Sequence, residues 1–172
     1  RGNLRWVMIF WAFVVATVSY LDRINLSIAA TALQSAFDID NVQLGWVFSA
    51  FVFGYALMQP IAGRVADAFG PYKLMAFAII WWGVFTALTP LVPAGVAYSL
   101  PLLIIVRTML GVGEAVIFPA SNRLVANWIP TSERGLANGL IFAGVGIGGG
   151  HDQASLSWGA LPMIWARRTS VR

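Results

Sequence analysis

The chain has 172 residues, of which 59% are hydrophobic and only 10% charged, and it carries eight tryptophans and eleven phenylalanines. Its mean hydropathy of +0.75 argues against an ordinary soluble domain. So do its repeated apolar runs, since about 20 residues cross a ~30 Å hydrocarbon core, and we predict an all-α, multi-pass transmembrane helical bundle. The net charge of +4 does not indicate nucleic-acid binding, because the basic residues are spread between the apolar runs instead of forming a patch.

Four apolar runs follow one another, each long enough for a helix that crosses a bilayer. They cover residues 6–33, 42–62, 74–91 and 99–125. Asp40 or Asn41 can cap the second helix by accepting a hydrogen bond from its free N–H groups, and Pro101 suits the first turn of the fourth helix. The segment 63–73 between the second and third runs is rich in turn formers and is predicted to be a short connection.

Basic residues occupy alternate connections between these runs. The N-terminus and the segments after the second and fourth runs hold Arg1, Arg5, Arg64, Lys73, Arg123 and Arg134. The segments after the first and third runs hold no Lys or Arg. By the positive-inside rule, the N-terminus is expected to be cytoplasmic, in a cell membrane that we take to be a bacterial inner membrane.

The fifth apolar run, residues 136–150, barely reaches the length of a span. The sequence then turns polar at 151–153 and ends with Arg167, Arg168 and Arg172, which would lie outside if the fifth run crosses. We therefore expect residues 1–150 to form a partial bundle of about five spans. Residues 151–172 read as an atypical tail, either a short luminal end or the product of a truncated or frame-shifted reading frame. The absence of an initiating Met is also consistent with a fragment.

Charged residues inside the apolar runs are the main candidates for function. Arg107 and Glu114 lie seven residues apart, so a helix places them on nearly the same face, roughly 10 Å apart along its axis. Asp22 and Arg23 interrupt the first run. Each charge costs at least ~2.5 kcal/mol at the bilayer centre, so such residues face a bundle interior or a watery cavity. The structural alternative is an ion-pair network that only fixes the helix register.

Polar side chains extend this pattern along two helices. In the first run they form two adjacent strips, Ser19–Asp22–Asn25 and Tyr20–Arg23–Ser27. In the second run Tyr55 and Gln59 are spaced i, i+4 and can face the same cavity. For this pair, interhelical hydrogen bonding without substrate contact is an equal alternative.

The chemistry of these groups favours coupled transport. A buried carboxylate can load or release a proton when a guanidinium moves toward it or away from it. An arginine is always charged and can bind a carboxylate in a bidentate manner, so the predicted substrate is an anion. The chain has no cysteine and a single histidine, His151. Because no nucleophile–base pair or metal-ligand spacing appears either, we predict neither an enzyme nor a metal or cofactor.

Several segments, in order, resemble the major facilitator superfamily and specifically its anion:cation symporter branch. YLDRIN at 20–25 is similar to the signature of the first helix, and the Gly-Tyr and Gln-Pro pairs within 54–60 to that of the second. GRVADAFGPYK at 63–73 resembles the loop motif between helices two and three. RTMLGVGEAVIFPA at 107–120 and WIPTSERG at 128–135 match the fourth helix and the loop after it.

The resemblance implies twelve spans in two six-helix halves that rock about a central site, so this chain would hold only part of the N-terminal half. It implies a proton-coupled symporter of small organic anions such as sugar acids. Asp22 and Glu114 would couple protons, with Arg107 as the switchable partner of Asp22. Arg23 would bind the substrate carboxylate. The grouped polar side chains around it would be Tyr20, Tyr55, Asn25 and Gln59.

The loop motif departs from the family pattern. Ala68, Pro71 and Tyr72 stand where basic residues are common, so its gating role is weakened. The positions that carry over are Gly63, Asp67, Gly70 and Lys73. The glycines within 144–150 form no antiporter-type motif and are expected to serve close helix packing. The alternative function is a non-transporting remnant or a membrane scaffold subunit.

Overall fold

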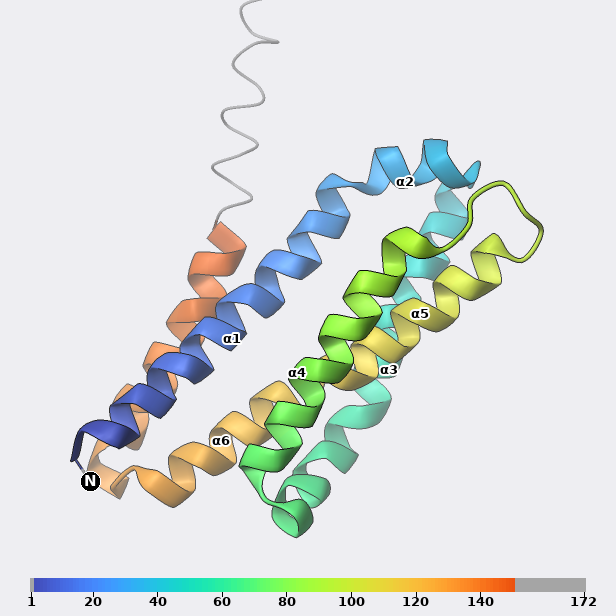
Figure 1. Cartoon of the computed structure of the whole chain (residues 1–172). Helices are drawn as coiled ribbons and strands as arrows, with labels where there is room; N and C mark the ends of the chain where they lie inside the picture. Colours follow the sequence, from blue (N-terminus) through green and yellow to red (C-terminus); the bar gives the residue numbers. More distant parts are fainter. Residues whose placement is uncertain (1, 151–172) are drawn as a thin grey trace, which may run out of the picture.

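The computed structural model describes residues 2–150, and within them it contains helices and connecting turns but no strands. The elements are α1 (Gly2–Ile28), α2 (Ala30–Phe37), α3 (Asn41–Phe69), α4 (Pro71–Leu88), η1 (Thr89–Leu91), α5 (Ser99–Glu114), α6 (Ile117–Trp128) and η2 (Thr131–Glu133). A further helical segment, unlabelled in Figure 1, covers residues 134–150. The predicted tail, 151–172, lies outside the described residues.

Within residues 2–150, four segments are long and apolar enough to cross a membrane. They are Leu4–Asn25, Asn41–Phe69, Pro71–Leu91 and Ser99–Trp128, close to the four predicted runs. The chain is thus an all-α, multi-pass membrane protein. Figure 1 shows the N-terminus, the α3–α4 junction and the end of α6 at one end of the bundle, with α2 and the α4–α5 connection at the other.

The ends of α3 show which local predictions hold. Asp40 is the N-cap, and its side chain accepts from the Gln43 backbone N–H while the Gln43 side chain accepts in return from the Asp40 backbone N–H. The predicted loop at 63–73 is wrong, because α3 continues to Phe69 and α4 begins at Pro71. Only Gly70 breaks the helix, with a φ of +83° that a glycine adopts without strain. The turn-forming residues otherwise lie in helix, where the apolar faces of α3 and α4 bury Ala66 and Leu74.

The fourth span is divided at the position that carries its acid. α5 ends at Glu114, and α6 begins at Ile117. Pro119 lacks the N–H that would bond the Ala115 carbonyl four residues earlier, and its ring disfavours a straight helix there. The break therefore places Glu114 in the last turn of α5, deep within the bundle.

The helices approach closely where they carry glycine. A Cβ on Gly54 of α3 would lie 2.2 Å from the Thr108 backbone oxygen, and one on Gly111 of α5 would lie 2.2 Å from the Phe51 backbone oxygen. Gly144 and Gly148 in the segment 134–150 similarly face the backbone of α1. A Cβ on Gly144 would lie 2.7 Å from the Phe13 backbone oxygen, and one on Gly148 would lie 2.7 Å from the Thr17 backbone oxygen. The role in close helix packing expected for the glycines within 144–150 is confirmed for Gly144 and Gly148, but not for Gly146 and Gly150, where a Cβ would meet nothing within 4 Å.

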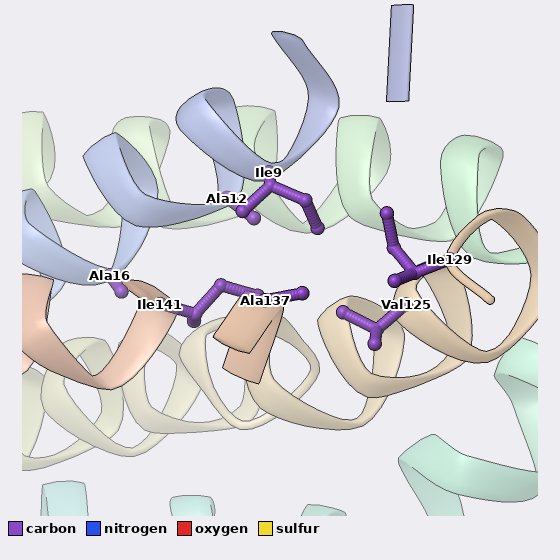
Figure 2. Packing of buried hydrophobic residues seen from close by; sticks show 7 residues of the cluster. All are labelled: Ile9, Ala12, Ala16, Val125, Ile129, Ala137 and Ile141. Atoms are coloured by element: carbon purple, nitrogen blue, oxygen red, sulfur yellow. The ribbon is translucent and has the colours of Figure 1, made fainter. Parts of the chain in front are cut away.

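One apolar cluster joins α1 to the later helices. Figure 2 shows side chains of α1 meeting those of α6 and of the segment 134–150. The cluster consists of Ile9, Ala12, Ala16, Val125, Ile129, Ala137 and Ile141. Its small residues let the backbones approach, as in other membrane bundles. With α1 held on this side, its Ser19, Asp22 and Arg23 side chains contact residues of α3, α4 and α5.

Candidate functional site

The most buried acid of the described residues is Glu114, which is fully shielded from solvent. Its Oε1 atom accepts hydrogen bonds from the Ser19 hydroxyl and from Arg23 Nε at 2.7 Å. Arg23 Nη2 lies 2.6 Å from the same oxygen. The other oxygen, Oε2, is buried and has no hydrogen-bond partner within residues 2–150. The site thus contains an ion pair between Arg23 and Glu114 in which one carboxylate oxygen, Oε2, accepts no hydrogen bond from the described residues.

Aromatic rings surround the Arg23 guanidinium. Its central carbon lies 4.9 Å from the ring centroid of Tyr20, 5.2 Å from that of Phe51 and 4.8 Å from that of Tyr55. Phe51 and Tyr55 are stacked, with centroids 6.1 Å apart. The negative faces of such rings attract a cation. They therefore stabilise the guanidinium in its position independently of its ion pair with Glu114. Tyr20 and Tyr55 are therefore brought to Arg23 as predicted from the sequence.

Arg107 is buried, with 6% of its surface exposed. Its guanidinium carbon lies 5.7 Å from the Phe51 ring centroid, and no acid within residues 2–150 lies in ion-pair contact with it. Its Nε atom is buried without an acceptor among the same residues. An Arg with unused donors in a bundle interior is well suited to bind an anion.

Asp22 is held by α4 rather than by Arg107. Its Oδ2 atom accepts hydrogen bonds from Trp82 Nε1 at 3.1 Å and from Thr86 Oγ1 at 3.4 Å. The expected ion pair between Asp22 and Arg107 is not formed in this structure. The contact between Trp82 and Asp22 was not predicted from the sequence. A tryptophan at mid-span, whose N–H needs an acceptor, was the available signal.

Two pockets open between these side chains. The larger, about 610 Å³, lies beside α3 and is lined by Arg23, Phe48, Ser49, Phe51, Val52, Phe53, Ala56 and Arg107. The smaller, about 200 Å³, is lined by Asp22, Asn25, Ala29, Thr86, Thr89, Pro90, Arg107 and Leu110. Arg107 lines both pockets, whereas Asn25 lines only the smaller one. Gln59 is half-buried on α3 and lines neither.

The predicted loop motif is only partly assembled. Asp67 of α3 forms an ion pair with Arg123 Nε of α6 at 2.9 Å, and both side chains are about half exposed. Gly70 supplies the turn, as described above. Gly63 lies in α3 beside open space, and Lys73 is exposed in the first turn of α4. Within the described part of the chain, Lys73 has no ion-pair partner.

The segment 128–135 anchors the same end of the bundle. Arg5 Nη2 lies 3.2 Å from Glu133 Oε2, which joins α1 to η2. Arg134 donates to the backbone oxygens of Ile129 at 3.1 Å and Ala126 at 2.8 Å. These two carbonyls lie at the end of α6, so Arg134 acts as a C-terminal cap of that helix. The resemblance pointed to this segment but not to these contacts.

The sequence profile described as Major Facilitator Superfamily matches residues 12–150. The chain is 39% identical over 141 residues to the "Probable galactarate/D-glucarate transporter GudP" of Pseudomonas putida. The aligned part covers 81% of this chain and 31% of that protein. It is 40% identical over 132 residues to the "Probable sulfoacetate transporter SauU" of Cupriavidus necator, covering 77% of this chain and 30% of that protein. It is 31% identical over 175 residues to the "Ascorbate transporter, chloroplastic" of Arabidopsis thaliana, covering 94% of this chain and 32% of that protein.

A solved structure shares the fold. The bacterial homologue of the human lysosomal transporter Spinster, in an inward-facing and unoccupied conformation, superposes with a TM-score of 0.76 at 23% identity, over 87% of this chain and 30% of that one. This chain spans about a third of the length of these proteins. The relatives are transporters, which confirms the prediction that the chain is not an enzyme. Because the profile covers most of the sequence and the fold agrees, the chain belongs to the Major Facilitator Superfamily.

Proposed function

We propose that the chain supplies the anion-binding and proton-coupling part of a secondary active transporter, a proton symporter of organic anions such as sugar acids. The observation that carries the proposal is the ion pair between Glu114 and Arg23, buried among aromatic rings beside a pocket of about 610 Å³. Relatives named for galactarate, D-glucarate and sulfoacetate support an organic anion as the substrate.

The pair can link a proton to an anion through a shared arginine. While Glu114 is charged, Arg23 donates to its Oε1 atom and is not free for a second carboxylate. A proton that reaches Glu114, whose Oε2 has no hydrogen-bond partner within residues 2–150, removes this attraction. Arg23 then turns to the pocket that it already lines and binds the anion. The rings of Tyr20 and Tyr55 hold it in place meanwhile.

A second guanidinium faces the same pocket. Arg23 and Arg107 lie 5.2 Å and 5.7 Å from the Phe51 ring centroid, so their central carbons are no more than about 11 Å apart. A linear diacid of the sugar-acid type can present one carboxylate to each. In this proposal Asp22 completes the proton pathway, and Asn25 and Gln59 contact the substrate only after the helices rearrange.

The orientation belongs to the same proposal. Five basic residues lie toward those ends of their helices that meet at the N-terminal end of the bundle: Arg5 near the start of α1, Arg64 near the end of α3, Lys73 in the first turn of α4, Arg123 in the second half of α6 and Arg134 directly after η2. These helix ends lie together in Figure 1. This gathering supports a cytoplasmic N-terminus in a bacterial inner membrane. Transport would require a second half opposite this bundle, as in relatives about three times as long. The comparisons do not favour a scaffold role.

Anion binding to the purified protein tests the proposal. With D-glucarate or galactarate as the probe, Arg23→Lys should weaken binding tenfold or more, because lysine retains the charge but loses the bidentate geometry. Arg123→Lys is the matched control, since Arg123 is exposed at the end of the bundle and should leave affinity unchanged. Wild-type affinity should fall as pH rises, whereas Glu114→Gln should bind equally at all pH values. Equal affinity in Arg23→Lys and wild type would contradict the proposal.

A further inference from the structure

Asp22 receives its hydrogen bonds from an otherwise apolar helix. The outward side chains of α4, such as Phe77, Ile80 and Val84, are exposed apolar groups suited to lipid. Trp82 on the opposite face is 8% exposed, and its indole N–H donates to Asp22 Oδ2 at 3.1 Å. Thr86, one turn later, lies 3.4 Å from the same oxygen. A buried indole needs an acceptor and a buried carboxylate needs donors, so the contact satisfies both groups.

Arg107 is the cation that this contact leaves without an acid. It lines the 200 Å³ pocket together with Asp22 and Thr86. The other guanidinium nearby, on Arg23, is already paired with Glu114. Hydrogen bonds from neutral donors to a charged carboxylate are stronger than hydrogen bonds between two neutral groups. A neutral donor can therefore compete with an arginine for the same oxygen.

We propose that Trp82, assisted by Thr86, is a positioning residue that holds the Asp22 carboxylate on α4 in competition with Arg107. Two arrangements follow. In the one observed, Asp22 rests on Trp82, and Arg107 is free to face the larger pocket that it shares with Arg23. In the other, Asp22 crosses the smaller pocket to pair with Arg107 and withdraws it from the anion. The consequence for anion binding rests on the proposed function, whereas the competition itself does not.

The indole N–H resonance of Trp82 tests the competition without any substrate. In the complete chain with ¹⁵N-labelled tryptophan in detergent, Asp22→Asn should move this resonance upfield, because the charged acceptor is lost. Arg107→Gln should move it further downfield, since Asp22 then has no other partner, and Arg107→Lys should give an intermediate shift. The indole of Trp81 donates to the Met109 backbone oxygen and should not respond. If the Trp82 indole N–H chemical shift were unchanged in both Arg107 variants, the proposal would be overturned.

Anion affinity provides the second arm of the test. Trp82→Phe retains the ring but removes the donor, so Asp22 should move to Arg107 and binding of D-glucarate should weaken by about tenfold. Combining it with Asp22→Asn should restore the affinity of Asp22→Asn alone. Trp81→Phe, the neighbouring control, should bind as wild type. Equal loss in the Trp81 and Trp82 variants would reduce Trp82 to a packing role. If the wild-type protein bound no organic anion, the proposed function would fail, and the indole resonance alone would decide the competition.

Discussion

The crossing of α3 and α5 gives the sharpest prediction, because it supports the site and tolerates no side chain. A Cβ on Gly111 would lie 2.2 Å from the Phe51 backbone oxygen and 3.0 Å from the Tyr55 nitrogen. Backbone atoms cannot rotate away, so Gly111→Ala must push the helices apart by roughly 1 Å. The shift would move Phe51 and Tyr55, whose rings cover the Arg23 guanidinium.

The size of the effect follows from two opposing contributions. Alanine gains about 1 kcal/mol over glycine in a helix interior. Overpacking in a close-packed interior costs about 1–3 kcal/mol, and the lost interhelical contacts add to that cost. The matched control is Gly83→Ala in α4, where a Cβ would meet nothing within 4 Å and only the favourable contribution remains. Both variants gain the same helix propensity, so they should differ by the overpacking cost alone, about 1–3 kcal/mol, the control being the more stable.

Thermal unfolding in one detergent, followed by near-ultraviolet circular dichroism, measures this difference. We expect Gly111→Ala to melt several degrees below wild type and Gly83→Ala at or slightly above it. Gly54→Ala should resemble Gly111→Ala, because its Cβ would meet the Thr108 backbone oxygen at the same distance. A Gly111→Ala protein as stable as the Gly83→Ala control would refute the reasoning that this crossing is in backbone contact.

Three further predictions concern single contacts and topology. Asp40→Ala should lower the stability of the α2–α3 corner by about 1 kcal/mol, measured as faster amide exchange in the first turn of α3, because the cap of that helix is lost. Asp67→Asn should change the unfolding free energy by less than about 1 kcal/mol, since its ion pair with Arg123 is half exposed; a larger loss would mean that the pair is shielded by lipid. A reporter enzyme fused after Ala36 should report a location outside the membrane, and one fused after Asn127 a cytoplasmic location. A cytoplasmic signal at Ala36 would contradict the predicted orientation.

Much of the fold could be predicted because apolar run length and turn chemistry are local properties. The four runs, the Asp40 cap and the first-turn position of Pro101 all appear where the sequence placed them. The α3–α4 connection could not be predicted from its glycines and charges, because tertiary packing of Ala66 and Leu74 keeps the surrounding residues helical.

In the site, too, local spacing predicted which residues face the interior, whereas the partners of these residues depend on tertiary packing. Helical spacing correctly placed Arg107 and Glu114 in the bundle interior and grouped Tyr20 with Arg23. Spacing states which face a charge occupies but not which neighbour it meets. Glu114 therefore pairs with Arg23 of α1 instead of an arginine on its own helix, and Asp22 bonds a tryptophan of α4. Such choices depend on how far apart the helices lie, which glycines such as Gly111 set.

Glu114 is the group proposed to exchange its arginine partner for a proton. The most direct test of this exchange is uptake of a radiolabelled sugar acid into proteoliposomes that hold a complete transporter with these residues, with and without an imposed pH gradient. Glu114→Gln retains size and hydrogen bonding but cannot titrate. We expect it to exchange substrate across the membrane while losing accumulation driven by the gradient. Gradient-driven accumulation by Glu114→Gln at the wild-type level would contradict the account.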